Sequence, residues 1–325
     1  MMNFLLQEMT YLRYFVPLIQ EGNRRNIASK IYWRPSNKYN CPSIHLNALN
    51  KLGEEFNFRT LKTEEFPRDS GDIVFSIEGR GTELAPNAKK VALTSMTDFR
   101  CLYDQAINNI DYYIFPNKSW ITHIPRDKPK LFNDKKTLYL GSPKYDAFFD
   151  KQKIIKKYNL PDKKKCLILF PRYRDIQKIN LIKVIRELKN LNFEVCMKAR
   201  GKEPCPKSIS NKVRYFEDES WHPHTSMELI SVSDLIINTD STGIKECVML
   251  RKPVLNFKIK PFVNPLKFLC DKKFCAEIET PINYDLISQK ANGLKNVSPN
   301  DFEETIDKYL FQPGSSKRIL DFFNL

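Results

Sequence analysis

Short runs of apolar residues alternate with longer amphipathic segments through most of the chain. The short runs are rich in β-branched and aromatic residues, which is typical of buried strands. In the longer segments, apolar residues recur every three to four positions, and this spacing predicts helices. Alternating strands and helices predict a doubly wound, mainly parallel α/β sheet. In the first half the strands are expected at residues 4–8, 30–33, 56–61, 72–77, 90–94 and 111–115, and helices at 11–20 and 43–52.

A break in the pattern between residues 141 and 161 indicates the start of a second α/β unit, because Gly141-Ser142-Pro143 interrupts regular structure. A helix is expected to open at Thr225 as its N-cap, with Glu228 completing a capping box. We expect domains over 1–140 and 141–310, and a C-terminal helix within 311–325 that could cross back to the first domain. The second unit is expected to contain strands at 166–170 and 193–197 and helices at 151–158, 179–189 and 301–310.

The segment from Asp234 to Lys260 has the clearest local pattern in the chain. A buried strand at 235–237 ends in a polar turn, a helix capped by Ser241 or Thr242 follows, and Pro253 ends that helix before a second strand at 254–257. This order predicts a right-handed βαβ crossover whose helix begins at the carboxyl edge of the sheet. Anions bind at such a helix terminus.

Two earlier basic turns are expected to meet this segment at the same edge, because each also follows a predicted strand. Guanidinium and ammonium groups neutralise phosphate oxygens, and hydroxyls and backbone N–H groups bind the rest. Taken alone, each basic turn favours a solvated loop. Together the three turns predict a diphosphate clamp, with these candidate residues: Arg172, Arg174, Lys198, Arg200, Asp240, Ser241, Thr242 and Gly243.

The net charge of +15 comes from 53 Lys and Arg residues against 38 Asp and Glu residues, spread along the chain. Such a spread favours anionic partners, such as nucleotide phosphates, acidic glycans or lipid headgroups. Solubility alone is the alternative explanation. The chain has no recognised nucleic-acid motif, so we expect no specific nucleic-acid partner.

Eight scattered cysteines include no CxxC pair, and they are expected to be reduced and buried. His222 and His224 lack a third ligand nearby in the sequence, so no metal is expected. The chain begins without the pattern of a signal peptide and has no apolar run of membrane-spanning length. We therefore expect a cytoplasmic protein, at most in peripheral contact with an anionic membrane.

Residues 241–246, STGIKE, followed by LRKPVLNFK, resemble the phosphate- and ribose-binding segment of bacterial UDP-N-acetylglucosamine 2-epimerases. The same stretch, with Gly141-Ser142-Pro143-Lys144-Tyr145-Asp146 and Arg174-Asp175, is similar to CDP-glycerol glycerophosphotransferases. The resemblance spans 141–260. It implies the GT-B architecture of nucleotide-sugar enzymes, in which two Rossmann-like doubly wound domains face a cleft. It further implies that Ser241 and Thr242 bind the donor phosphates and that Glu246 binds the ribose.

The catalytic residues of neither family have counterparts in this chain, so the acid–base residue is predicted from the chemistry of the reaction. A transfer reaction needs a carboxylate or imidazole in the first domain to deprotonate the acceptor. Asp98 is the first candidate because it ends a polar turn after a predicted strand, and Glu8 is the second; Glu78 also follows a strand. Trp221 could stack on the base and His222 could contact a phosphate, although both could equally pack in a proline turn.

These observations predict a glycosyltransferase that moves a sugar from a nucleotide-diphosphate donor to a glycan or lipid-linked acceptor in surface polysaccharide synthesis. The first domain would bind the acceptor and the second the donor. No cofactor or metal is expected, since the nucleotide sugar is a co-substrate. The alternatives are a CDP-glycerol or polyol-phosphate transferase, an enzyme like UDP-N-acetylglucosamine 2-epimerase and, outside enzymes, a basic nucleic-acid-binding protein.

Overall fold

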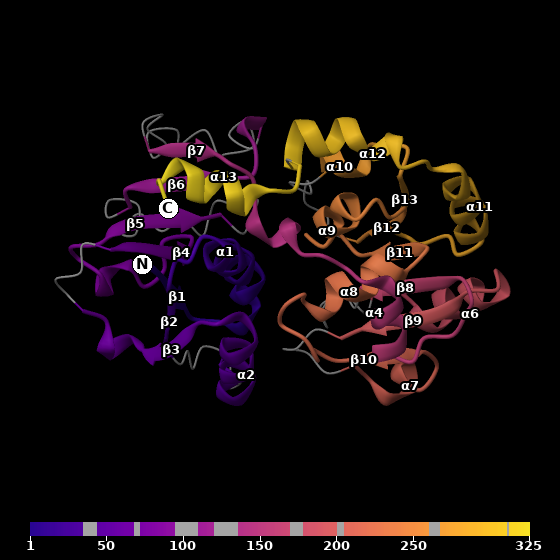
Figure 1. Cartoon of the computed structure of the whole chain (residues 1–325). Coiled ribbons are helices and arrows are strands. Elements are labelled where there is room, and N and C mark those ends of the chain that lie inside the picture. Colours follow the sequence, from indigo (N-terminus) through magenta and orange to yellow (C-terminus); the bar gives the residue numbers. More distant parts are fainter. Residues whose placement is uncertain are drawn as a thin grey trace. The chain divides into compact units, whose positions relative to one another are not determined.

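The computed structural model describes residues 1–34, 44–67, 72–94, 110–119, 136–169, 178–199, 205–259, 267–310 and 312–325 (Figure 1). The chain forms two compact units. Unit 1 comprises Met1–Ala147 and Lys308–Leu325, and unit 2 comprises Phe148–Asp307. The chain therefore leaves unit 1 once and returns to it. The boundary expected between residues 140 and 141 falls inside unit 1.

Unit 1 is built on a seven-stranded sheet with the strand order β3-β2-β1-β4-β5-β6-β7. All neighbouring strands are parallel, so their carboxyl ends lie at one edge. The pattern of the sequence predicts every strand except β7. The elements are β1 (Met2–Leu6), β2 (Ser29–Trp33), β3 (Arg59–Lys62), β4 (Ile73–Ile77), β5 (Lys89–Leu93), β6 (Tyr112–Phe115), β7 (Thr137–Tyr139), α1 (Leu12–Arg24), α2 (Leu46–Phe56) and α13 (Ser315–Phe322).

Unit 2 contains a six-stranded parallel sheet with the order β10-β9-β8-β11-β12-β13. Its strands are β8 (Lys165–Leu169), β9 (Glu194–Lys198), β10 (Arg214–Phe216), β11 (Leu235–Asn238), β12 (Val254–Lys258) and β13 (Cys275–Glu279). The described helices are α4 (Lys151–Lys157), α6 (Leu181–Asn190), α7 (Lys207–Ser210), α8 (Thr225–Val232), α9 (Ile244–Met249), α10 (Lys267–Cys270), α11 (Leu286–Gly293) and α12 (Asn300–Thr305). The helix expected over 301–310 is α12 followed by a π-helical turn over Ile306–Leu310.

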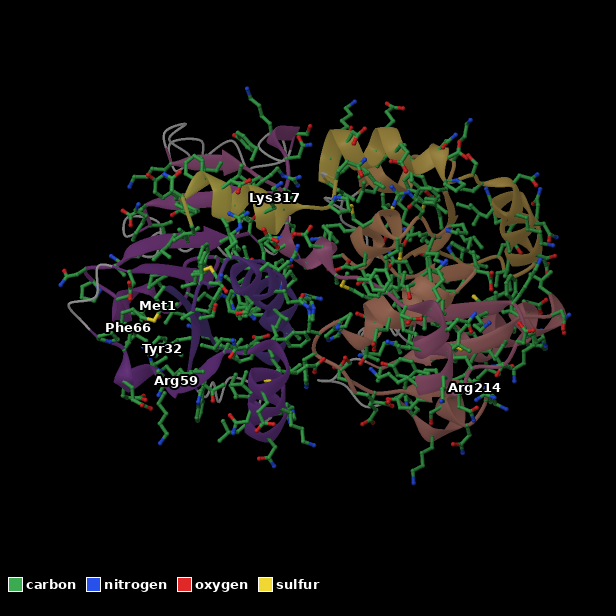
Figure 2. All side chains as sticks on the ribbon, in the orientation of Figure 1. Met1, Tyr32, Arg59, Phe66, Arg214 and Lys317 are labelled. Carbon is green, nitrogen blue, oxygen red and sulfur yellow. The ribbon has the colours of Figure 1, made fainter. Side chains whose placement is uncertain are left out.

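Aromatic side chains fill much of the core of unit 1. The ring of Phe4 lies 5.1 Å from that of Phe15 and 5.3 Å from that of Phe75, so β1 is held to both α1 and β4. Nearer the edge strand β3, Tyr32 packs against Phe66 at 4.8 Å in an edge-to-face arrangement (Figure 2). Such pairs add stabilisation beyond the burial of their area.

Residues 141–146 hold the C-terminal helix α13 on unit 1. A Cβ at Gly141 would lie 2.1 Å from Ser315 Oγ, and the φ of +93° at Gly141 also favours glycine. The Asp146 carboxylate accepts hydrogen bonds from three backbone N–H groups, which would otherwise be unsatisfied at a helix start. Those donors are Gly314 (2.6 Å), Ser315 (3.1 Å) and Ser316 (2.6 Å). In this chain the segment therefore has a structural role within unit 1.

Candidate functional site

The order of the second sheet reverses between β8 and β11. Strands β9 and β10 continue outward from β8, whereas β12 and β13 continue outward from β11. Ligands of open α/β sheets bind at the carboxyl edge beside such a reversal. The turn over residues 239–243 follows β11 directly and therefore lies at this position.

A buried polar network fixes the turn that follows β11. Asn256, in the middle of β12 and fully buried, accepts from Asn238 Nδ2 (2.9 Å) and from the backbone N of Asp240 (3.1 Å) through its Oδ1. Its Nδ2 donates to Asp240 Oδ1 (3.1 Å) and Glu277 Oε1 (2.9 Å). Asp240 Oδ2 also accepts from the backbone N of Ile259 (2.9 Å). Asp240, which has a φ of +48°, is thus held between β11 and β12.

Ser241 and Thr242 sit on this rigid base and reach the surface. Ser241 is half-buried and Thr242 is exposed. Helix α9 begins at Ile244 with Gly243 as its N-cap, so the prediction that Ser241 or Thr242 is the N-cap is wrong. The Ser241 hydroxyl instead accepts from the backbone N of Gly243 at 3.4 Å.

Gly243 allows the turn to approach the end of β8 closely. A Cβ at this position would lie 2.8 Å from Leu169 Cδ1. One turn of α9 further on, Glu246 is buried, with 6% of its surface exposed. The structure therefore brings Asp240, Ser241, Gly243 and Glu246 together at the reversal point of the second sheet.

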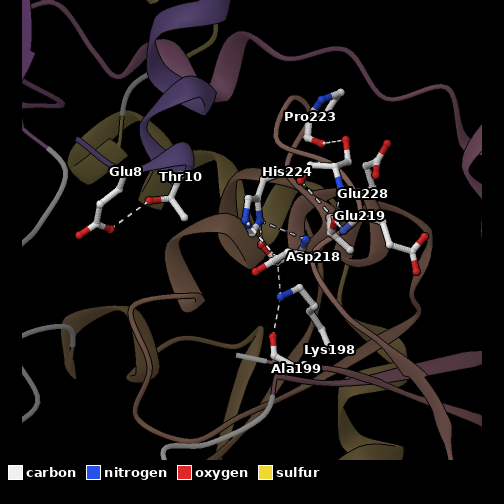
Figure 3. Close-up of polar contacts among 12 residues, drawn as sticks. Glu8, Thr10, Lys198, Ala199, Asp218, Glu219, Pro223, His224 and Glu228 are labelled. Carbon is white, nitrogen blue, oxygen red and sulfur yellow. Dashed lines mark hydrogen bonds and ion pairs between the residues drawn. The ribbon is translucent and has the colours of Figure 1, made fainter. Parts of the chain in front are cut away.

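Lys198, at the end of β9, lies in a buried array with two residues from the connection between β10 and α8 (Figure 3). Lys198 Nζ is 2.6 Å from Asp218 Oδ1, and it also donates to the Ala199 carbonyl oxygen. The same Asp218 oxygen lies 3.3 Å from His224 Nε2. The Lys198 side chain is only 6% exposed, and the adjacent Asp218 carboxylate balances its buried positive charge.

The connection from β10 to α8 is closed by its own hydrogen bonds. Thr225 Oγ1 accepts from the backbone N of Glu219 (2.9 Å) and of Ser220 (2.8 Å). The predicted capping box is wrong, because Thr225 is the first residue of α8 and His224 is its N-cap. His224 Nδ1 accepts from the backbone N of Ser226 at 3.3 Å. The Thr225 side chain faces back into the loop, because its hydroxyl accepts from the backbone N–H groups of Glu219 and Ser220.

Trp221 and His222 belong to this same connection. Trp221 is half-buried, and its ring lies 5.9 Å from the ring of His224 in an edge-to-face arrangement. His222 is buried, and burial lowers its pKa from the ordinary 6.5 to about 4, so its imidazole is neutral at physiological pH.

The first sheet reverses its order between β1 and β4. Glu8, which is half-buried, follows β1 and accepts from Thr10 Oγ1 at 3.4 Å (Figure 3). Glu78, which is buried, follows β4 with a φ of +56° and pairs with Arg80 at 3.3 Å. Arg80 also donates to Tyr11 OH at 2.8 Å. The two loops at this reversal therefore carry two carboxylates and a guanidinium.

The other candidates, Asp98, Arg172, Arg174 and Arg200, lie outside the described residues. Among the residues that the structure does describe, no group of three or more His, Cys, Asp or Glu side chains is placed to hold a metal ion. The described cysteines are free thiols, and burial raises the pKa of Cys166 and Cys247 well above the usual thiol value. Within the ranges that the structure describes, no helix has the length and apolar character needed to span a membrane.

No family model and no curated protein matches the sequence. Solved structures do match it. A variant of the wall teichoic acid polymerase TagF is 14% identical, with a TM-score of 0.68, over 99% of this chain and 88% of that chain. UDP-GlcNAc 2-epimerases from Neisseria meningitidis and Methanocaldococcus jannaschii are each 13% identical over 99% of both chains, with TM-scores of 0.65 and 0.66.

The two parallel sheets and these likenesses identify the fold as two Rossmann-like domains of the GT-B type. This confirms the fold class expected from the sequence. It also confirms that the two groups of proteins that residues 141–260 resemble are structural neighbours of the whole chain.

Proposed function

We propose that the protein is a glycosyltransferase that moves a sugar from a nucleotide-diphosphate donor to a glycan or lipid-linked acceptor in surface polysaccharide synthesis. The main support is the turn over 239–243, which lies at the reversal point of the second sheet with Thr242 exposed and Ser241 half-buried. Structural neighbours of the same fold are described as bound to UDP-GlcNAc, or to UDP-GlcNAc and UDP.

In this proposal the donor diphosphate lies against Ser241, Thr242 and the N-cap Gly243, and the polar network beneath them supplies rigidity. A site that is rigid before binding loses less entropy when it takes up its ligand. Arg172, Arg174 and Arg200 neutralise the phosphate charge. The ammonium group of Lys198, held in place by its ion pair with Asp218, contributes a further positive charge. Asp240 holds the turn in place.

Glu246 and the β10–α8 connection supply the other half of donor recognition. The Glu246 carboxylate accepts hydrogen bonds from the ribose hydroxyls, Trp221 stacks on the base and His222 contacts a phosphate. A neutral His222 can donate a hydrogen bond to a phosphate oxygen without carrying a charge. These roles follow from the resemblance and from the position of the residues at the carboxyl edge of unit 2.

Transfer requires a base on the acceptor side. The acceptor hydroxyl oxygen attacks the anomeric carbon while a carboxylate takes its proton, and the bond from that carbon to the donor phosphate oxygen breaks. The electron pair leaves with the nucleoside diphosphate. Asp98 is the proposed base and Glu8 the second candidate. Glu8 lies at the reversal point of the first sheet, where such a group is expected.

Two other reactions are possible on the same fold, and their products differ. A polyol-phosphate transferase acting on CDP-glycerol would cleave between the phosphates and release CMP. A 2-epimerase would change the sugar of a nucleotide sugar with no acceptor present. The likeness to TagF favours the first alternative, and the likeness to the UDP-GlcNAc 2-epimerases favours the second. Contact with an anionic membrane surface would place a lipid-linked acceptor within reach.

The experiment is product analysis after incubation of the full chain with UDP-, GDP- and CDP-linked donors, with and without a panel of glycan acceptors. Chromatography that shows acceptor-dependent release of nucleoside diphosphate supports the glycosyltransferase. Release of CMP from CDP-glycerol assigns the polyol-phosphate transferase, and an altered nucleotide sugar without acceptor assigns the epimerase. If no donor is converted and no nucleoside diphosphate stabilises the protein, the nucleotide-sugar function is wrong.

A further inference from the structure

The β10–α8 connection, residues 217–224, begins where the pairing of β10 with β9 ends, at Phe216, and is closed by hydrogen bonds at its other end. At the α8 end, Thr225 binds the backbone N–H groups of Glu219 and Ser220, and Trp221 and His224 form an antiparallel bridge. Ser220 Oγ also donates to the Pro223 carbonyl oxygen at 2.7 Å. The loop is therefore stiff in itself, but none of these contacts ties it to the neighbouring strand β9.

Asp218 supplies a side-chain tie to β9, beyond the backbone pairing that ends at Phe216. Its Oδ1 lies 2.6 Å from Lys198 Nζ, at the end of β9, and 3.3 Å from His224 Nε2, at the start of α8 (Figure 3). His224 Nδ1 caps α8, 3.3 Å from the Ser226 backbone N and 2.8 Å from Ser226 Oγ, and Nε2 on the other side of the ring faces Asp218. One carboxylate thus connects the strand, the loop and the helix cap.

The loop and the turn over 239–243 both lie at the carboxyl edge of unit 2. Asp218 and His224 are beside Lys198 at the end of β9, and β9 is two strands away from β11 in the sheet order. At the usual strand spacing the ends of β9 and β11 are about 10 Å apart. A nucleoside diphosphate carries its phosphates at one end and its base at the other. A ligand whose phosphates lie at the turn can therefore present its base to the loop, whereas pyrophosphate is too short to do so.

We propose that Asp218 is a positioning residue for recognition of the nucleobase. It holds the β10–α8 connection against β9, so that the half-buried ring of Trp221, backed by His224, presents a fixed surface to the base. This inference rests on the proposed function, because it assumes that unit 2 binds a nucleoside diphosphate. To that function it adds a role for Asp218, which keeps the base-binding loop in place without contacting the ligand itself.

The test compares two ligands on one variant. In Asp218→Asn, we expect the Kd of UDP or CDP to rise about tenfold, the scale of one base–aromatic stacking contact, while the Kd of pyrophosphate, which has no base to stack, rises much less. Glu219→Gln is the matched control, because it removes the same charge from an exposed neighbour in the loop. This control should bind both ligands as the wild type does. Asp218→Glu, which keeps the carboxylate, should recover part of the affinity for the nucleotide.

Asp218→Asn also removes a carboxylate from beside the buried Lys198 and could unfold unit 2, so a second variant is needed. His224→Asn keeps a good helix cap and leaves the Lys198–Asp218 pair in place, but it removes the imidazole from Asp218 and from Trp221. Circular dichroism and the melting temperature report folding, and calorimetric titration reports binding. We expect the same loss for UDP and a much smaller loss for pyrophosphate.

The outcomes separate this inference from the function on which it rests. If the wild type binds UDP and a folded Asp218 or His224 variant binds it equally well, Asp218 does not position the loop. An equal loss of UDP and pyrophosphate affinity would also overturn the inference, because it would show general damage to unit 2. If the wild type binds no nucleoside diphosphate, the proposed function itself fails.

Discussion

Asn256 is the residue on which the rigidity of the donor-site turn depends most. Its side chain makes five hydrogen bonds to four residues, Asn238, Asp240, Glu277 and Cys270, and both Asn238 and Asn256 are fully buried. Asn256→Ala removes the acceptor of the Asp240 N–H and one donor to the Asp240 carboxylate. A buried polar group that loses its partner costs about 1–3 kcal/mol, so two such groups cost roughly 2–6 kcal/mol.

This destabilisation should be visible in a melting experiment. Unit 2 spans Phe148–Asp307, and for a domain of this size each kcal/mol changes the melting temperature by about 2–4 °C. We therefore expect Asn256→Ala to lower the transition of unit 2 by on the order of 10 °C. Because Ser241 and Thr242 stand on the network, the variant should also lose stabilisation by nucleoside diphosphates.

Two further substitutions make the test specific. Asn256→Asp keeps the shape and one acceptor, but it places a carboxylate beside Asp240 and Glu277; it should destabilise unit 2 at neutral pH and less so in acid. Asn292→Ala, on the exposed surface of α11, is the control and should leave the transition unchanged. If Asn256→Ala melts within about 2 °C of the wild type and still responds to nucleotide, the network does not support the site.

Two other predictions concern the acid–base chemistry and the dependence of stability on pH. Asp98→Asn should leave the Kd of the donor unchanged but abolish acceptor-dependent turnover, measured as nucleotide release; retained turnover would move the base to Glu8 or Glu78. Burial lowers the pKa of His222 to about 4, so the unfolded chain takes up a proton at this residue before the folded chain does. Its contribution to stability should be full above pH 6.5 and should be lost as the pH falls from 6.5 towards 4, by on the order of 3 kcal/mol. Denaturant midpoints of the wild type and His222→Gln across this range check it, and parallel pH profiles would contradict it.

The alternation of apolar and amphipathic segments is enough to predict the two parallel sheets, because strands buried on both faces are continuous apolar runs. The pattern does not predict β10 or β13. Strand β10 has only three residues, Arg214–Phe216, and β13 is the edge strand Cys275–Glu279, in which charged side chains alternate with apolar ones. Such segments lack the signal that burial gives to central strands.

The candidate site could be predicted as a position in the chain but not as a set of contacts. The turn over 239–243 follows from the strand–turn–helix pattern, whereas the partners of Lys198 do not, since Asp218 and His224 come from a connection after another strand. Asn256 carries a weak signal, because it is a single amide within the apolar strand Val254–Lys258. The helix caps are wrong by one or two residues because caps depend on local backbone angles, which the residue types only bias.

The most direct measurement is the melting temperature of the wild type and of Ser241→Ala/Thr242→Ala with UDP, GDP and CDP at millimolar concentration. A ligand at one hundred times its Kd adds about 2.7 kcal/mol, which corresponds to a rise of roughly 5–10 °C. We predict such a rise for at least one nucleotide with the wild type, and its near absence with the double variant, which should melt like the wild type without ligand. A wild type that responds to none of the three nucleotides, or a double variant that responds as strongly as the wild type, would contradict the assignment of this turn as the donor site.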